Sequence, residues 1–228
     1  MNILKPALVL LSLSNLVAAM PTGLYLGATG HHSSSDVEHT VTESDAVETI
    51  VRGHAGLKGF GLGFNTGYRY ILKDKYIMGI DFAVLKANAD YIGTNTDVDT
   101  GNGTSTEQSK LTLELNYALY PMASIGYLSS DKTAISFKAG YGLENWKTAY
   151  TKATTPYLTE PDNHIKGPVV AAEVLTQVKD KVYLSLSSSL SFLDKTVTST
   201  DTETSSCTLC IKPETFSSAL SLQYVPKG

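Results

Sequence analysis

The sequence feature that most constrains the fold is a strict two-residue alternation between Gly59 and Lys86. From Phe60 to Leu72 the even positions are aromatic or aliphatic apart from one threonine, and the odd positions are mostly glycine or polar. After a charged turn at Lys73-Asp74-Lys75 the alternation resumes from Tyr76. A side-chain period of two indicates a strand with two unlike faces, and each run is longer than the usual strand of about five or six residues. The stretch therefore predicts a β-hairpin whose wide apolar face contacts lipid.

The same pattern recurs along the chain and predicts eight strands in all. Besides the two hairpin strands, these are residues 22–34, 109–122, 134–146, 167–178, 182–192 and 214–225. Their connections alternate in length. Four are long and polar (35–52, 91–108, 147–164 and 194–213), and three are short (73–75, 129–132 and 179–181). This asymmetry is typical of transmembrane barrels, with short turns in the periplasm and long loops outside.

The predicted fold class is therefore all-β: an eight-stranded antiparallel up-and-down transmembrane β-barrel with four long outer loops and three short periplasmic turns. Backbone amides in lipid must be paired within the protein, so the sheet has to close on itself. A soluble lipocalin-like barrel is the alternative, but its apolar residues would point inward. The serine-lined second face of residues 182–192 and the regular alternation of loop lengths favour the membrane barrel.

Residues 1–19 have the organisation of a signal peptide. Lys5 precedes an apolar run from Ala7 to Val17, and Val17-Ala18-Ala19 supplies the small residues of a cleavage site. A buried N-terminal helix is the alternative interpretation. The predicted organisation is a signal peptide at 1–19 and one barrel domain at 20–228, and the chain is expected to be exported.

Composition narrows the functional classes. The chain carries 22 acidic and 18 basic residues, a net charge of −4, so it lacks the basic surface that nucleic-acid binding requires. Mean hydropathy is near zero, as expected when lipid-facing and lumen-facing residues cancel.

With its exported leader, eight alternating strands, long polar segments and glycine-rich stretch at 59–67, the chain resembles the small outer-membrane β-barrel proteins of Gram-negative bacteria. These are the OmpA-like, OmpX-like and opacity-type surface proteins. Members end in alternating apolar residues that close on an aromatic, a signal read by the outer-membrane assembly machinery. Leu220, Leu222 and Tyr224 have this spacing, although Val225-Pro226-Lys227-Gly228 follow them. The resemblance implies location in the cell outer membrane, contact with outer-membrane lipid and lipopolysaccharide, and assembly by that machinery.

Charged and polar residues occupy the face opposite the apolar one and are predicted to form a lumen polar network. They are Arg69, Asp81, Glu114, Lys138, Glu173 and Gln177. Enclosed charges must be paired or hydrated. One interpretation is an internal network of ion pairs that closes the barrel, and the other is a narrow conducting path. Eight strands leave an interior that side chains can fill, which favours the closed lumen.

An enzymatic site is the less favoured alternative. Small barrels can carry catalytic histidines with Ser, Asp or Glu at their outer rim, and His31, His32 and Ser33 lie near Asp36. We interpret them as polar loop residues. His31, His32 and His39 lack a specific metal-ligand spacing, so we expect no enzyme activity, no metal and no cofactor.

Cys207 and Cys210 form a C-x-x-C in the last long loop. In an exported chain a loop disulfide is favoured over a redox or zinc site.

An aromatic belt at the lipid boundary is expected to include Trp146, Tyr25 and Tyr70. The expected function is a structural or adhesion-type surface scaffold, with host or cell-surface ligands at its loops. A narrow porin is the alternative.

Overall fold

The computed structural model describes residues 22–44, 48–95, 98–99, 104–105, 109–152, 155–202 and 205–226. The predicted signal peptide at 1–19 lies outside these residues. The described chain consists of strands and turns. The strands are β1 (Gly23–Ser44), β2 (Glu48–Leu72), β3 (Tyr76–Asn95), β4 (Val98–Asp99), β5 (Thr104–Ser105), β6 (Ser109–Ser130), β7 (Thr133–Lys152), β8 (Thr155–Lys179), β9 (Val182–Phe192), β10 (Lys195–Thr202) and β11 (Ser205–Tyr224).

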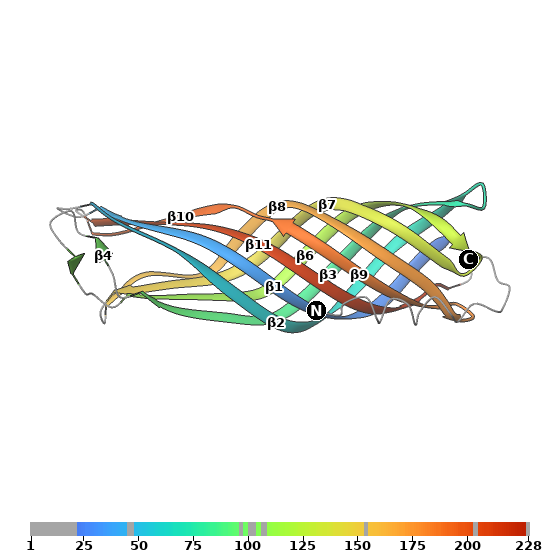
Figure 1. Cartoon of the computed structure of the whole chain (residues 1–228), viewed down its shortest axis with the longest axis horizontal. Coiled ribbons are helices and arrows are strands. Elements are labelled where there is room, and N and C mark those ends of the chain that lie inside the picture. The colour runs from blue at the N-terminus through green and yellow to red at the C-terminus, as the bar shows by residue number, and fades with distance from the viewer. Residues whose placement is uncertain are drawn as a thin grey trace.

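The long strands form a closed antiparallel barrel in the order β1-β2-β3-β6-β7-β8-β9-β11 (Figure 1). Pairing of β1 with β11, from Leu26 with Tyr224 to Ser44 with Ser206, closes the sheet. β10 follows β9 after an interruption at Leu193 and Asp194, and continues the pairing with β11. The barrel therefore has eight strand positions, as the sequence predicts.

No helix among the described residues is long and apolar enough to cross a bilayer.

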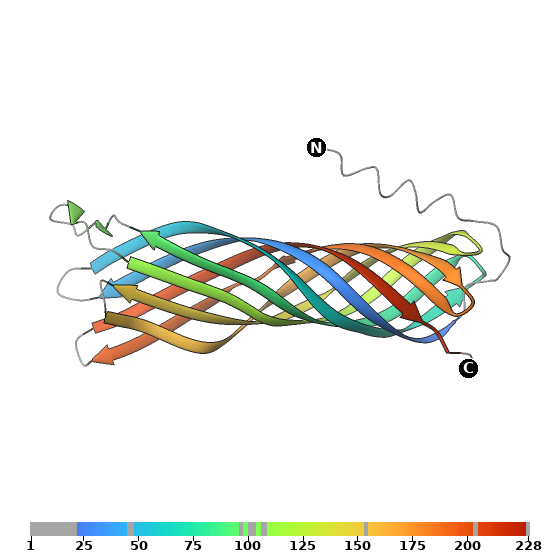
Figure 2. The same ribbon diagram turned by 90° about the horizontal axis from the view of Figure 1, so that it is seen from below.

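Both chain ends of the described barrel lie at the same end as the three short turns, and β4 and β5 lie at the opposite end (Figure 2). The turn after β2 has a hydrogen bond from Lys75 N to Leu72 O of 3.2 Å. Its two central residues, Lys73 and Asp74, both have φ of 53°. Positive φ at both central positions is the type I′ geometry, which matches the twist of a tight hairpin.

The strands are longer than the sequence predicts. β1 continues to Ser44 and β2 starts at Glu48, so most of the predicted loop 35–52 is paired strand. The other three predicted loops are shortened in the same way by β3, β7, β8, β10 and β11. The apolar alternation that marked the strands requires one face in lipid. Beyond the charged border the outward side chains are polar, and inward residues such as Val37, Leu57 and Ile211 are apolar and buried. The outward apolar pattern therefore ends there, although backbone pairing continues.

A belt of outward-facing apolar side chains surrounds the half of the barrel nearer the short turns. On β2 it runs from Phe60, which is 75% exposed, to Leu72. Tyr70, Tyr76, Tyr127 and Tyr224 are exposed at its turn end, and the rings of Tyr76 and Tyr127 meet edge to face at 6.1 Å. At its other end the belt gives way to exposed charged residues, namely Lys58, Lys86, Lys166, Asp194 and Glu214. An apolar band with an aromatic rim and a charged border is the lipid-facing surface of a transmembrane barrel of the outer-membrane type.

Candidate functional site

The lumen within this belt is filled in layers. At the turn end an apolar layer contains Tyr25, Ile77, Leu175 and Tyr183. Farther from the turns a second apolar layer contains Leu85, Ala118, Tyr120 and Val169. Charged residues meet between the two layers, and they form the candidate functional site.

Lys138 on β7 is at the centre of the charged layer. Its Nζ lies 3.0 Å from Asp81 Oδ1 on β3 and 3.0 Å from Glu173 Oε2 on β8. All three side chains are buried. The Tyr25 hydroxyl donates a hydrogen bond to the same Asp81 oxygen. One cation thus bridges two carboxylates, which offsets the cost of enclosing each charge.

Arg69 completes the layer from the opposite wall. Its Nη2 donates to Gln223 Oε1 over 2.6 Å and lies 3.8 Å from Glu173 Oε2. The guanidinium stacks on the Tyr25 ring, with Cζ 3.9 Å from the centroid, a favourable cation–π geometry. β2 and β8 are four positions apart in the barrel order. The Arg69–Glu173 pair therefore crosses the full width of the lumen.

Gln223 links this layer to two further strands. Its Nε2 donates to Glu173 Oε1 over 3.3 Å and to Ser185 Oγ over 3.2 Å. The layer has two positive and two negative side chains, so its charges balance. A selective ion path is usually lined by charges of one sign, whereas this layer is a set of paired charges.

A small cavity of about 60 Å³ lies in the lumen beside this network. Its lining includes Thr29, Tyr120 and the serines Ser187, Ser189, Ser217 and Ser221. Thr29 Oγ1 and Ser221 Oγ are 2.6 Å apart. A cavity of this volume has room for a few water molecules.

A second polar cluster surrounds Glu144, which is fully buried. Its Oε1 accepts hydrogen bonds from Tyr120 Oη at 2.6 Å and Ser191 Oγ at 3.3 Å. Its Oε2 accepts one from Trp146 Nε1 at 2.9 Å. Three neutral donors hold this carboxylate at the level of the second apolar layer.

Four of the six residues predicted for the lumen network meet there: Arg69, Asp81, Lys138 and Glu173. Glu114 does not. It lies on the outer surface and pairs with Lys147 at 3.4 Å, both side chains being more than 40% exposed. The reason is a bulge in β6. The pairing with β7 skips from Leu115 to Tyr117, so the faces exchange and Leu113 and Leu115 point inward.

Gln177 lies apart from the charged layer. It is half-buried near the turn end, and its Oε1 has no hydrogen-bond partner among the described residues. Pairing of β8 with β9 is irregular between Gln177 and Lys179, so the alternation that placed Gln177 in the network ends there.

The lumen also contains residues that the sequence interpretation placed elsewhere or did not single out. Trp146 and Tyr25 were expected in the aromatic belt but are both 1% exposed and face inward, whereas Tyr70 is 51% exposed and lies on the lipid face. Glu144 and Gln223 were not identified. The alternation could have identified them, because each directly follows an outward-facing residue, Leu143 and Leu222 respectively. Both are therefore expected to face the lumen.

The glycines of β2 make room for inward-facing rings. A Cβ at Gly67 would come within 2.7 Å of Tyr25 Cε1 and 2.8 Å of its hydroxyl oxygen. A Cβ at Gly61 would clash with the Lys86 carbonyl oxygen on β3 and come within 2.6 Å of His31 Nε2. Each contact is shorter than real Cβ contacts. The glycine-rich face of β2 therefore lets Tyr25 lie against the strand and reach Arg69 and Asp81.

The histidine cluster of the alternative enzymatic interpretation is not assembled. His31 and Ser33 are buried on the lumen face of β1, whereas Asp36 is exposed on the other face. Among the described residues no group of His, Cys, Asp or Glu is arranged to hold a metal ion. The side chain of His39 lies outside the described part of the chain.

The disulfide between Cys207 and Cys210 stays a prediction, because the side chain of Cys207 also lies outside the described part. Both residues are on β11, where residues three apart are separated by about 10 Å along an extended strand. A disulfide needs Cα atoms within about 7 Å, so it would require β11 to bend locally.

Leu220, Leu222 and Tyr224 face outward on the same strand and are about half exposed. Their role as an assembly signal also stays a prediction.

No protein-family model matches the sequence, and no curated protein matches it. Solved structures with a similar fold include the outer membrane protease OmpT of Escherichia coli, with a TM-score of 0.49, 8% identity and coverage of 93% of this chain and 99% of that one. The outer membrane protein OprG of Pseudomonas aeruginosa has a TM-score of 0.46, 10% identity and coverage of 92% and 100%. Neisserial surface protein A has a TM-score of 0.43, 16% identity and coverage of 88% and 96%.

Proposed function

We propose that this protein is an integral β-barrel of a Gram-negative outer membrane whose lumen is closed and whose function resides in the part that projects outside the cell. The observation that carries the proposal is the double pairing of Lys138 with Asp81 and Glu173, both at 3.0 Å. Around it, ion pairs and hydrogen bonds join seven of the eight strand positions. A lumen crossed by paired side chains supports a structural scaffold.

A narrow porin is the second candidate, and the lumen cavity of about 60 Å³ with its serine lining favours it. In a porin, water would fill this cavity and form a continuous path past the charged layer. The cavity is also lined by Asp81, Lys138 and Glu173, and because their charges are paired they argue against strong ion selectivity. The closed scaffold explains more of the geometry.

Conductance of the refolded protein in a planar bilayer tests the proposal. We expect no steady single-channel conductance from protein shown to be folded. Glu173→Gln removes a lumen charge, and Glu114→Gln makes the same change on the outer surface. In a closed barrel neither variant conducts, although Glu173→Gln is less stable. A steady wild-type conductance that changes with Glu173→Gln and is unaffected by Glu114→Gln would establish the porin instead.

We assign the surface role to the outer part of the barrel. Supporting this, seven of the barrel strands continue beyond the charged border of the belt, β10 continues the position of β9, and the β4–β5 pair lies at that end (Figure 1). Binding residues are often carried by connections on a rigid scaffold. Cells that display the protein should adhere to a host or neighbouring cell surface, and replacing residues 96–108 with a Gly-Ser linker should reduce adhesion. Unchanged adhesion with normal surface display would contradict a role for this connection.

A further inference from the structure

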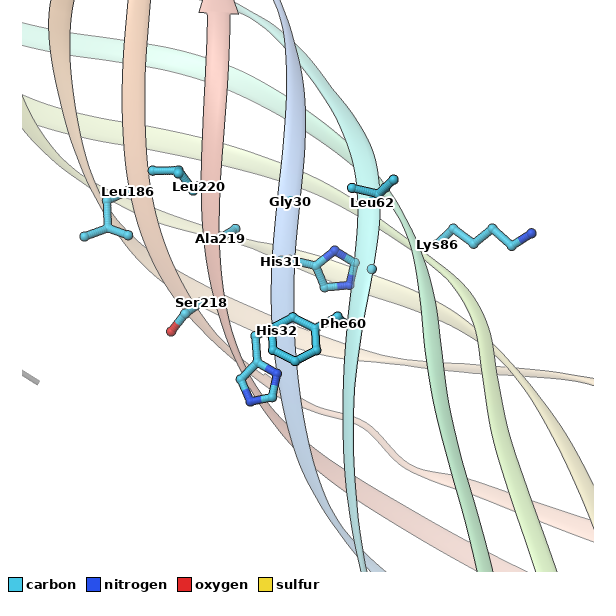
Figure 3. A pocket seen from close by; sticks show the side chains of 11 residues that line it. Gly30, His31, His32, Phe60, Leu62, Lys86, Leu186, Ser218, Ala219 and Leu220 are labelled. Atoms are coloured by element: carbon cyan, nitrogen blue, oxygen red, sulfur yellow. The ribbon is translucent and has the colours of Figure 1, made fainter. Parts of the chain in front are cut away.

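The lipid-facing belt contains a hollow of about 650 Å³ over β1. Gly30 lies at its floor, with Leu62 and Leu220 directly beside it on the two neighbouring strands. Figure 3 shows Leu186 and Leu220 on one side of Gly30 and Leu62 on the other. A Cβ at Gly30 would meet nothing within 4 Å. The hollow exists because β1 lacks a side chain where its neighbours have large ones.

A second hollow of about 460 Å³ lies next to the first, toward the short turns. Ala28, the next outward residue of β1, is part of its lining, with Leu26, Phe64 and Leu222 around it. We call the two hollows together the β1 trough. From Leu26 to His32 the trough extends about 20 Å along the tilted strand, which corresponds to about 15 Å of the roughly 25 Å height of a barrel's apolar band.

The outer end of the trough carries positive charge and a fixed ring. Lys86 on β3 lines the first hollow beside Leu62, with which it is paired, and its exposed side chain extends past Leu62 and away from Gly30 (Figure 3). Lys58 is exposed on the same face of β2, just beyond Phe60. The His32 ring stacks on Phe60 with centroids 4.6 Å apart, and its Nδ1 donates to Gly59 O over 2.9 Å. The lysines lie at the charged border of the belt, where lipid headgroups are found.

We propose that the β1 trough binds one acyl chain of a phosphorylated lipid of the outer leaflet, with the lipid phosphate on Lys86. In a Gram-negative outer membrane that lipid is lipopolysaccharide. The apolar walls and length of the trough fit an extended chain, and the lysines complement an anionic headgroup. This inference rests on the proposed outer-membrane location, because only there is the charged border next to such a leaflet.

Native mass spectrometry of the refolded protein in detergent, mixed with purified lipopolysaccharide, tests the inference. The wild type should retain one lipopolysaccharide molecule. Gly30→Leu fills the trough and should weaken binding about tenfold. Ala139→Leu is the matched control, because Ala139 is exposed on β7, on the opposite side of the barrel. It should bind like the wild type.

The contribution of the Lys86 charge is tested with the same mass-spectrometric binding measurement. Lys86→Gln should weaken binding about fivefold, the order expected for one lysine at an anionic lipid surface. Lys166→Gln, an exposed border lysine on β8, should have no effect. Equal binding by Gly30→Leu and the wild type, or equal retention of phosphatidylglycerol and lipopolysaccharide, would overturn the inference. A wild-type dimer that Gly30→Leu dissociates would also overturn it and assign the trough to a second copy of the chain.

Folding of each variant is followed by its heat-dependent gel mobility. A folded barrel that conducts would refute the proposed closed lumen and leave the trough unaffected. Absence of lipid binding by a closed, folded barrel would refute the trough alone.

Discussion

Trp146 Nε1 donates a hydrogen bond of 2.9 Å to Glu144 Oε2, although the two residues are only two positions apart on β7. Both side chains are buried in the lumen. Pairing of β7 with β8 is irregular between Trp146 and Thr148, immediately after this contact. The indole and the carboxylate therefore form a fixed unit at the outer end of the membrane-spanning lumen.

Glu144→Gln should destabilise the barrel by about 1–3 kcal/mol. Three donors point at the carboxylate, and the amide nitrogen of glutamine cannot accept from any of them. Urea unfolding followed by tryptophan fluorescence measures the change, since Trp146 is the only tryptophan. Ser191→Ala removes only the longest of the three hydrogen bonds, at 3.3 Å, and should lower the free energy of unfolding by less than Glu144→Gln does. An equal loss in both variants would show that the donors do not act on the carboxylate as described.

Lys138→Met should cost about 3–5 kcal/mol, because it leaves the buried carboxylates of Asp81 and Glu173 without their shared cation. Lys147→Met is the matched control. Its partner Glu114 is exposed, so its loss should cost at most about 1 kcal/mol. Equilibrium unfolding in urea compares the two. Similar losses would mean that water enters the charged layer and screens it.

Gly67→Ala should destabilise the barrel by about 1–3 kcal/mol, the usual cost of overpacking, because the added methyl meets the Ile80 carbonyl oxygen on β3 and the Tyr25 ring. Gly30→Ala adds the same methyl where nothing lies within 4 Å and should change stability by no more than about 0.5 kcal/mol. The fraction of folded protein after heating measures both. A Gly67→Ala variant as stable as the wild type would show that neither the Tyr25 ring nor the Ile80 carbonyl needs to lie this close to Gly67.

Replacing Lys73-Asp74 with Asn-Gly should stabilise the protein by about 1 kcal/mol. Both native residues have φ of 53°, a conformation that Asn and Gly adopt at lower cost. Asn-Gly in place of Asp131-Lys132 is the control, since neither of these residues has positive φ, and should not stabilise. Urea midpoints of the two variants check the prediction. A gain at both turns would exclude the backbone geometry as its cause.

The sequence predicts strand order, barrel closure and most of the charged layer because side chains that face lipid have to be apolar. Arg69, Asp81, Lys138 and Glu173 follow directly from that alternation. Glu114 does not, because leucine suits both lipid and an apolar lumen layer. The pattern of Leu111, Leu113 and Leu115 therefore continues through the bulge without showing that the faces have exchanged. Tyr25 and Trp146 were misplaced for a related reason, since an aromatic residue suits both the lipid boundary and a packed lumen.

The length of the strands has a consequence for where any outer contact is made. Roughly twelve residues of β1 continue past His32 to Ser44. At about 3.3 Å per residue and a tilt of about 40°, they rise about 30 Å above the lipid. The barrel is thus a stalk as well as an anchor. It carries the outer ends of its strands clear of the headgroups, so that a partner can reach them without approaching the membrane itself.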